Sequence, residues 1–135
     1  MPELCRAILD RWPLEACVVT LGERGSYAES RAGERVHVPG HAVTVADTCG
    51  SGDAFSAAFV HLYLRGRSLA DCCRLGNALG ARVATQAGAT APVAPGALAS
   101  LLEGGAPPEG AASRVAEPSL RDFIAKENGA LRWGD

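Results

Sequence analysis

The stretch at residues 47–55, Asp-Thr-Cys-Gly-Ser-Gly-Asp-Ala-Phe, has the residue types and spacing for phosphate chemistry. Two glycines flank Ser51, and Asp53 follows them at the start of an apolar run with helical spacing. If a helix begins near Gly52, the amides of Gly50, Ser51 and Gly52 point outward without an intrahelical partner, and such a terminus binds anions. A carboxylate repels a bound phosphate, so Asp53 is better explained as the group that orients a hydroxyl and accepts its proton during phosphoryl transfer.

An acid in the first turn of a helix also has a structural explanation, and glycine-rich turns precede helices in many α/β proteins. The longer string distinguishes these interpretations, because residues 47–53 resemble the second signature of the PfkB (ribokinase-like) carbohydrate kinase family, Asp-Thr-x-Gly-Ala-Gly-Asp. Ser51 replaces the usual alanine and keeps the backbone amide. The resemblance implies that Asp53 is the catalytic acid/base residue and that the amides of Gly50, Ser51 and Gly52 form an anion hole.

A second block, residues 16–25, is an apolar run that ends in Thr20, Leu21 and Gly22, with Gly25 three residues further on. Such a run predicts a strand buried on both faces of a parallel sheet, and ligands bind beyond the carboxyl ends of such strands. Alone, this pattern is more often a tight turn than a nucleotide loop. It is similar to the family's Thr-Leu-Gly-x-x-Gly segment, which implies that these four residues contact ATP.

A third block, residues 77–92, contains Asn77 among small apolar residues of an expected helix, and a polar amide there needs a partner if it is buried. The family places a residue beside the nucleotide base at this spacing after the catalytic acid. Gly88 and Ala89 resemble the segment that closes the adenine pocket. Many members also bind a monovalent cation near the anion loop, which makes Asp47 and Cys49 candidate ligands by position.

The resemblance covers roughly residues 3–103 and only the carboxyl-terminal part of the family. Complete members carry an amino-terminal half with a Gly-Gly signature, most sugar-binding residues, lid strands and an Asn-x-x-Glu motif, and this chain contains none of these. We therefore expect a fragment, a split-gene product or a truncated reading frame. Such a chain would need the missing half or would self-associate.

The implied fold is a ribokinase-like three-layer α/β/α sandwich, present as its carboxyl-terminal portion. The implied function is ATP-dependent phosphorylation of a sugar hydroxyl, with Mg²⁺ on the nucleotide phosphates and K⁺ as the candidate monovalent cation. The details resemble bacterial fructokinase-like members most. Two alternatives stay open: a pyridoxal- or hydroxymethylpyrimidine-type vitamin kinase of the same superfamily, and a non-catalytic nucleotide-binding fragment or subunit completed in trans.

Composition is typical of a cytosolic α/β enzyme. The 135 residues are 47% hydrophobic and 21% charged with a net charge of −2, which argues against disorder and against a nucleic-acid-binding surface. No apolar run reaches the length of a membrane span, and the amino terminus is not a signal peptide, so we expect a cytoplasmic location. The five cysteines lack zinc-site spacing and predict reduced, mostly buried thiols.

Hydrophobic periodicity and turn residues predict one helix, then four strands and then three helices. Helices are expected at residues 3–11, 52–64, 68–86 and 95–102, and strands at 17–21, 26–30, 35–38 and 43–45, the second and third strands forming a hairpin. Beyond the kinase-like region of residues 1–103, residues 104–118 are rich in Gly, Pro and Ala and predict a linker, and residues 119–135 predict a short helical tail.

Overall fold

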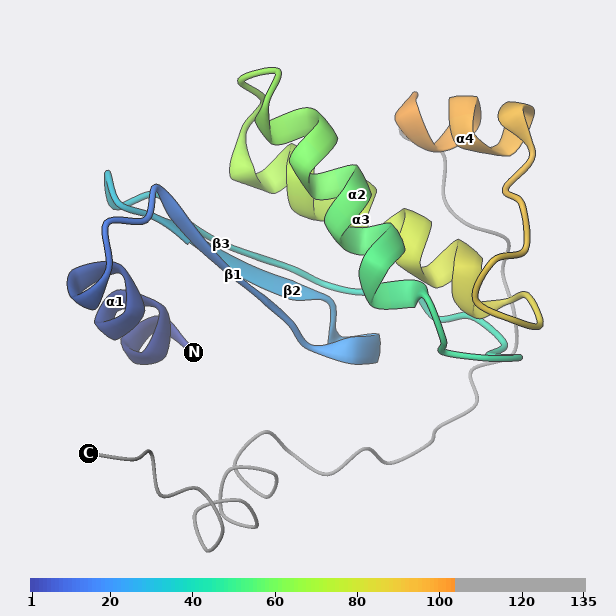
Figure 1. The fold of residues 1–135 in the computed structure, drawn as a ribbon, viewed down its shortest axis with the longest axis horizontal. Coiled ribbons are helices and arrows are strands. Elements are labelled where there is room, and N and C mark those ends of the chain that lie inside the picture. Colours follow the sequence, from blue (N-terminus) through green and yellow to red (C-terminus); the bar gives the residue numbers. More distant parts are fainter. Residues whose placement is uncertain (104–135) are drawn as a thin grey trace, which may run out of the picture.

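The computed structural model describes residues 1–103 (Figure 1). Its elements are, in order, α1 (Pro2–Arg11), β1 (Ala16–Thr20), the 3₁₀ turn η1 (Gly22–Arg24), β2 (Ser26–Ser30), β3 (Arg35–Val38), α2 (Ser51–Tyr63), α3 (Leu69–Ala84) and α4 (Pro95–Leu102). The linker and tail predicted at residues 104–118 and 119–135 lie outside the described residues.

The three strands form an antiparallel sheet in the order β1-β2-β3. Val18 lies opposite Ala28, and Ala28 lies opposite Val36, so one register runs across the whole sheet. The hairpin predicted at residues 26–30 and 35–38 is confirmed with the same bounds, and its turn contains Gly33 at φ 95°.

Alternation along the strands divides the core into two sets of side chains. Cys17 and Tyr27 pack with Cys5 and Leu9 of α1 on one face of the sheet. On the other face Ala28 packs with buried side chains of α2 and α3, namely Phe55, Phe59, Leu69, Cys72 and Cys73. Figure 1 shows α1 on one side of the sheet and the α2–α3 pair on the other. This part of the chain is therefore a partial α/β fold, with helices on both faces of a small antiparallel sheet.

Two strand predictions need correction. Residues 43–45 form no strand, and the amides of Ala46 and Asp47 just beyond them donate to the carbonyl of Ala84 at the end of α3. In β1, Cys17 is buried but its neighbours are only half-buried, and its described partner is the antiparallel β2. The apolar sequence of residues 16–21 predicted the strand, but a strand's partners and their direction depend on distant residues.

The helices start and stop close to their predicted bounds. Ser68 caps α3 by accepting a hydrogen bond from the amide of Asp71, so the helix begins one residue later than expected. Gly66, at φ 69°, lies in the turn that separates α2 from α3. The helix predicted at residues 95–102 is confirmed as α4. In residues 1–103 no helix is long and apolar enough to cross a bilayer.

All five cysteines are free, as predicted, and four of them are buried while Cys49 is exposed. Burial raises the pKa of the Cys5 thiol to about 12, and a hydrogen bond with Cys17 adds to the effect. The buried thiols of α1 and α3 thus act as small apolar core residues.

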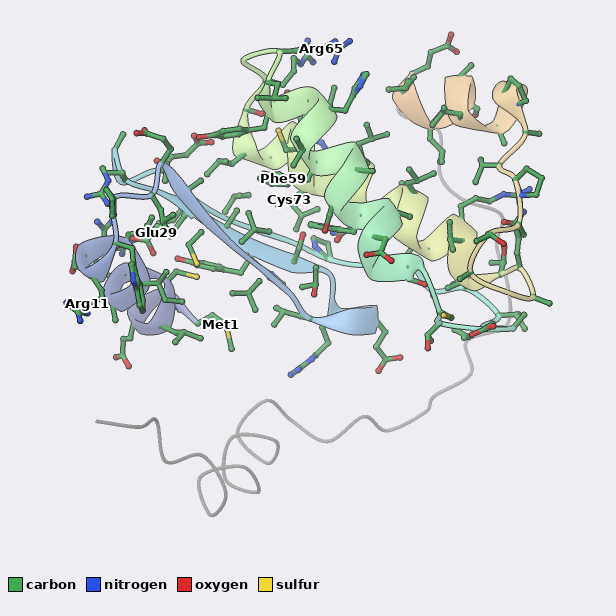
Figure 2. All side chains as sticks on the ribbon, viewed as in Figure 1. Met1, Arg11, Glu29, Phe59, Arg65 and Cys73 are labelled. Carbon is green, nitrogen blue, oxygen red and sulfur yellow. The ribbon has the colours of Figure 1, made fainter. Side chains whose placement is uncertain are left out.

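Glu29 is a buried acid that joins α1 to the sheet. Its carboxylate forms ion pairs with Arg6 and with Arg35, the latter at 3.2 Å, and accepts a hydrogen bond from the Tyr27 hydroxyl at 3.0 Å. Figure 2 shows Glu29 on the α1 side of the sheet, opposite Phe59 and Cys73. Burial alone would raise the pKa of Glu29, but these three partners outweigh it and lower the pKa.

We expect Glu29→Gln to lower the thermal unfolding midpoint at pH 7 several times more than Asp10→Asn, which changes an exposed acid of α1. Because the folded-state pKa of Glu29 is depressed, its stabilisation is present above the unfolded pKa of about 4.3 and is lost as pH falls through the folded value. The difference between wild type and Glu29→Gln should therefore shrink in thermal melts below about pH 4. A pH-independent difference would contradict this role.

We also expect the purified 135-residue chain to self-associate. Within residues 1–103, β1 pairs with β2 only and leaves one backbone edge open, and Trp12 and Leu14 beside it are exposed. An open edge next to apolar surface promotes association. Size-exclusion chromatography with light scattering should show concentration-dependent oligomers, and a monomer at all concentrations would argue against it.

Candidate active site

The glycine-rich loop before α2 has the geometry of an anion-binding turn. α2 begins at Ser51, and Gly50 caps it at φ 82° and ψ −9°, a left-handed conformation that favours glycine. The Ser51 amide donates to the Thr48 carbonyl at 3.2 Å, whereas the amides of Gly50 and Gly52 have no partner within the described residues. A Cβ at Gly52 would meet nothing within 4 Å, so a ligand can approach closely there.

Asp53 lies in the first turn of α2, and its side chain is exposed. It forms no hydrogen bond or ion pair with other residues in the range 1–103. The carboxylate thus lies at the positive end of the helix dipole, next to the glycine amides, with both oxygens available. This is the position that a base acting on a neighbouring hydroxyl needs.

Asp47 links the anion loop to the turn after α3. One oxygen, Oδ1, accepts a hydrogen bond from the Cys49 amide at 2.9 Å, and Oδ2 accepts one from the Gly88 amide at 3.1 Å. Next to this link, a Cβ at Gly50 would lie 2.7 Å from the carbonyl oxygen of Ala89. The structure therefore brings together five predicted site residues from two segments: Asp47, Cys49, Gly50, Gly88 and Ala89.

Asn77 is buried on α3, and its side-chain NH₂ donates to the carbonyls of Val38 and Pro39, each at 3.1 Å. Both N–H groups of the Asn77 side chain are therefore hydrogen-bonded to backbone carbonyls at the end of β3 and just after it. These bonds supply the partner that a buried polar amide needs. The amide oxygen remains the group that could contact a ligand. Contact with a nucleotide base stays a prediction.

The turn at Gly22 and Gly25 packs on that same backbone. Leu21 donates its amide to the Gly25 carbonyl at 2.7 Å, and Gly25 adopts φ 90°. A Cβ on Gly25 would lie 2.0 Å from the Val38 carbonyl oxygen, so only glycine fits. Thr20, just before the turn, is exposed. Residues 38–40 thus connect this turn to Asn77, and the role of the turn in ATP contact stays a prediction.

The candidate cation ligands do not form a dedicated metal cluster. In the described part of the chain no three His, Cys, Asp or Glu side chains lie close enough to hold a metal ion. Asp47 already accepts two backbone hydrogen bonds, and Cys49 is exposed. A monovalent ion at this loop would depend chiefly on backbone carbonyls.

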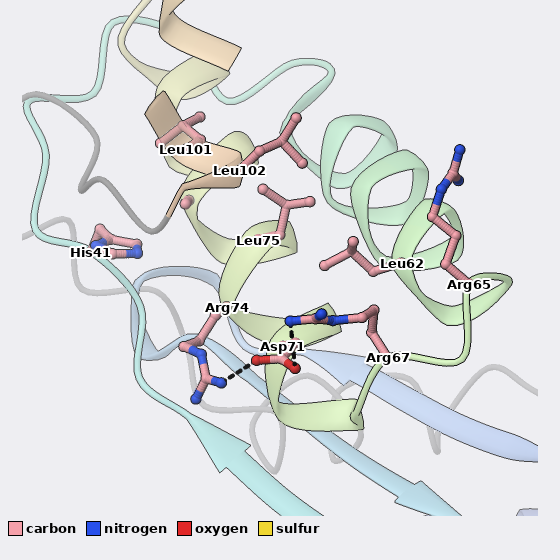
Figure 3. A pocket seen from close by; sticks show the side chains of 10 residues that line it. His41, Leu62, Arg65, Arg67, Asp71, Arg74, Leu75, Leu101 and Leu102 are labelled. Atoms are coloured by element: carbon pink, nitrogen blue, oxygen red, sulfur yellow. Dashed lines mark hydrogen bonds and ion pairs between the residues drawn. The ribbon is translucent and has the colours of Figure 1, made fainter. Parts of the chain in front are cut away.

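A pocket of about 450 Å³ lies at the opposite end of α2 and contains none of the predicted site residues (Figure 3). Three arginines line it, Arg65, Arg67 and Arg74. Asp71 forms ion pairs with Arg67 at 3.5 Å and with Arg74. These contacts with the arginines, together with the Ser68 hydroxyl, lower the pKa of Asp71. The arginines are largely exposed and in part neutralised, so we assign no ligand to this pocket.

Comparison with known proteins shows to which family this chain is related. The chain is 38% identical over 117 residues to the bifunctional protein HldE of Halorhodospira halophila, covering 87% of this chain and 24% of that protein. Adenosine kinase from Sinorhizobium meliloti matches 72% of this chain and 28% of its own at 37% identity and a TM-score of 0.58. An Escherichia coli ribokinase II candidate, solved with ATP and Mg²⁺, matches 66% of this chain and 29% of its own at 28% identity and a TM-score of 0.57.

The chain spans about a quarter of the length of the HldE protein that it matches, so the alignment concerns a portion of that longer protein. Residues 3–95, more than half of the chain, match the profile described as pfkB family carbohydrate kinase. The chain belongs to the pfkB family of carbohydrate kinases.

Proposed function

We propose that this chain supplies the ATP site and the catalytic acid of a kinase that transfers the γ-phosphoryl group of ATP to a sugar hydroxyl. The observation that carries the proposal is the start of α2, where a left-handed Gly50 leaves amides available beside the exposed Asp53. Family membership supports the reaction class.

In this mechanism Asp53 accepts the proton of the attacking hydroxyl as the oxygen–phosphorus bond forms. The amides of Gly50, Ser51 and Gly52 stabilise the charge that spreads over the transferring phosphoryl oxygens. Ser51 would share its amide between Thr48 and the phosphate, because the Thr48 contact is long at 3.2 Å. The anion hole therefore depends on backbone amides, and the glycines are needed so that the phosphate can approach those amides closely.

The nucleotide would lie between the turn of Thr20, Leu21, Gly22 and Gly25 and the segment of Gly88 and Ala89. The contacts of residues 38–40 with both Asn77 and Gly25 support this arrangement, because they hold the turn against α3. Asn77 would offer its amide oxygen to the base, since its NH₂ group is committed to carbonyls.

Magnesium would neutralise the nucleotide phosphates during transfer. The residues here fit an ion that arrives with ATP, because Asp53 is the unpaired acid beside the amides and no acidic cluster accompanies it within residues 1–103. The E. coli relative solved with ATP and Mg²⁺ supports this cofactor choice. Potassium remains the candidate monovalent ion near Asp47 and Cys49.

The acceptor would be selected outside this chain. The chain covers about a quarter of HldE and of adenosine kinase, whose names differ, so the shared portion is better suited to binding the common nucleotide. We therefore expect weak ATP binding and negligible sugar phosphorylation from the isolated chain, because substrate positioning is a large part of phosphoryl-transfer catalysis.

The Asp53→Asn variant tests the catalytic assignment. In a chimera that joins residues 1–103 to the amino-terminal portion of a family kinase, we expect kcat to fall by about 10²-fold or more while ATP affinity changes by no more than several-fold. Loss of a negative charge near the phosphates would, if anything, tighten ATP binding. Steady-state kinetics and isothermal titration measure the two quantities.

Asp10→Asn in α1 is the matched control, because it removes an exposed acid far from α2 along the chain, and it should keep kcat. Near-normal turnover in Asp53→Asn would remove Asp53 from the base role. Absence of ATP binding by the unmodified chain, measured at millimolar ATP, would argue for a fragment without a nucleotide site.

The Ser51→Ala variant distinguishes the contribution of the Ser51 backbone amide to ATP binding from that of the Ser51 hydroxyl. Among the residues that the structure describes, the buried Ser51 hydroxyl oxygen has no hydrogen-bond partner. Its removal should raise the free energy of unfolding by about 1 kcal/mol and leave ATP affinity within twofold, because the amide remains. Chemical denaturation and ATP titration test this, and a large loss of ATP affinity would assign the hydroxyl to the site.

A further inference from the structure

The carboxylate of Asp47 is the side-chain link between the two segments of the proposed ATP site. It accepts one hydrogen bond from the Cys49 amide in the loop before α2. It accepts another from the amide of Gly88, which lies 41 residues further along the chain. Two backbone hydrogen bonds to the Ala84 carbonyl, from Ala46 and Asp47, hold the same segments together at 2.8 and 3.3 Å. The segment before α2 and the turn after α3 are thus joined both by the Asp47 side chain and by backbone hydrogen bonds of Ala46 and Asp47.

An aspartate is chemically suited to this link. Its two oxygens accept from two amides at once, and hydrogen bonds to an ionised acceptor are stronger than neutral ones. Asparagine has one acceptor oxygen and would keep one of the two bonds. Alanine would keep neither, so a graded series of variants is available at this position.

The link controls a close contact between the segments. Gly50 lies so near Ala89 that a Cβ would be 2.7 Å from its carbonyl oxygen, and Gly50 sets the start of α2. A ligand that contacts both the amides at Gly50 and Gly52 and the backbone at Gly88 and Ala89 needs both segments in place together. Holding them in place before binding lowers the ordering cost of the complex.

We infer that Asp47 is a positioning residue that holds the anion loop against the turn at Gly88, so that ATP meets both in one arrangement. This inference rests on the proposed function. It is a different role from that of cation ligand, which position alone suggested for Asp47, because it depends on the two backbone hydrogen bonds of the carboxylate.

The test compares Asp47→Asn and Asp47→Ala with wild type in the full 135-residue chain. Amide hydrogen exchange by NMR should speed up at Gly88 or Cys49 by about tenfold in Asp47→Asn and at both residues in Asp47→Ala. ATP affinity by isothermal titration should fall by about tenfold in Asp47→Asn and further in Asp47→Ala. Charge removal alone would tighten the binding of anionic ATP, so the sign of the change is diagnostic.

The matched control is Asp71→Asn, which removes one negative charge and two ion pairs at the other end of α2. It can lower the thermal midpoint but should leave ATP affinity and the exchange of Gly88 unchanged. Titrations in potassium and in tetramethylammonium buffers separate positioning from cation binding. Positioning predicts the same loss of affinity in both buffers.

Unchanged exchange at both Gly88 and Cys49 in Asp47→Ala would overturn the link itself. Faster exchange with wild-type ATP affinity would overturn its positioning role, and a loss of affinity confined to potassium buffer would favour a cation ligand instead. If the wild-type chain binds no ATP, the proposed function fails and the positioning role fails with it, while exchange still reports the link.

Discussion

The close approach of α2 and α3 is the constraint on which the rest of the structure depends. A Cβ on Gly76 would lie 2.7 Å from the ring of Phe55, and one on Gly80 would lie 3.1 Å from the Ser51 carbonyl oxygen. Phe55 reaches the sheet and packs in the cluster of Ala28, so the same contact joins both helices to the strands. Because the helices run this close, the loop before α2 meets the turn after α3.

Two acids in this chain lie in opposite environments, one suited to a structural role and the other to a chemical one. Glu29 is fully buried, and Arg6, Arg35 and Tyr27 engage its oxygens, so its charge is used to hold α1 on the sheet. Asp53 is exposed beside unpaired amides and has no partner in the described part of the chain. A buried and fully paired carboxylate cannot act on a ligand, whereas an exposed one at a helix N-terminus can.

Local sequence predicted the elements whose partners are close along the chain. The hairpin of β2 and β3 and the short helix α4 have the predicted bounds, because turn glycine, strand alternation and a proline at the helix start are local signals. The strand expected at residues 43–45 failed for the opposite reason, since nearby amides bond to Ala84, about 40 residues away. The arginines around Asp71 were also missed, because their proximity arises from a turn between two helices.

The sequence by itself determined that a glycine-rich loop is followed at once by an acid, and it predicted phosphate chemistry there because that chemistry needs glycines and a carboxylate in immediate succession. Only the tertiary structure decided that Asp47 joins this loop to Gly88 and that the Asn77 amide is committed to Val38 and Pro39. These hydrogen bonds join residues about 40 positions apart. Whether such groups meet depends on how closely the helices pack, and no local pattern of residues encodes that distance.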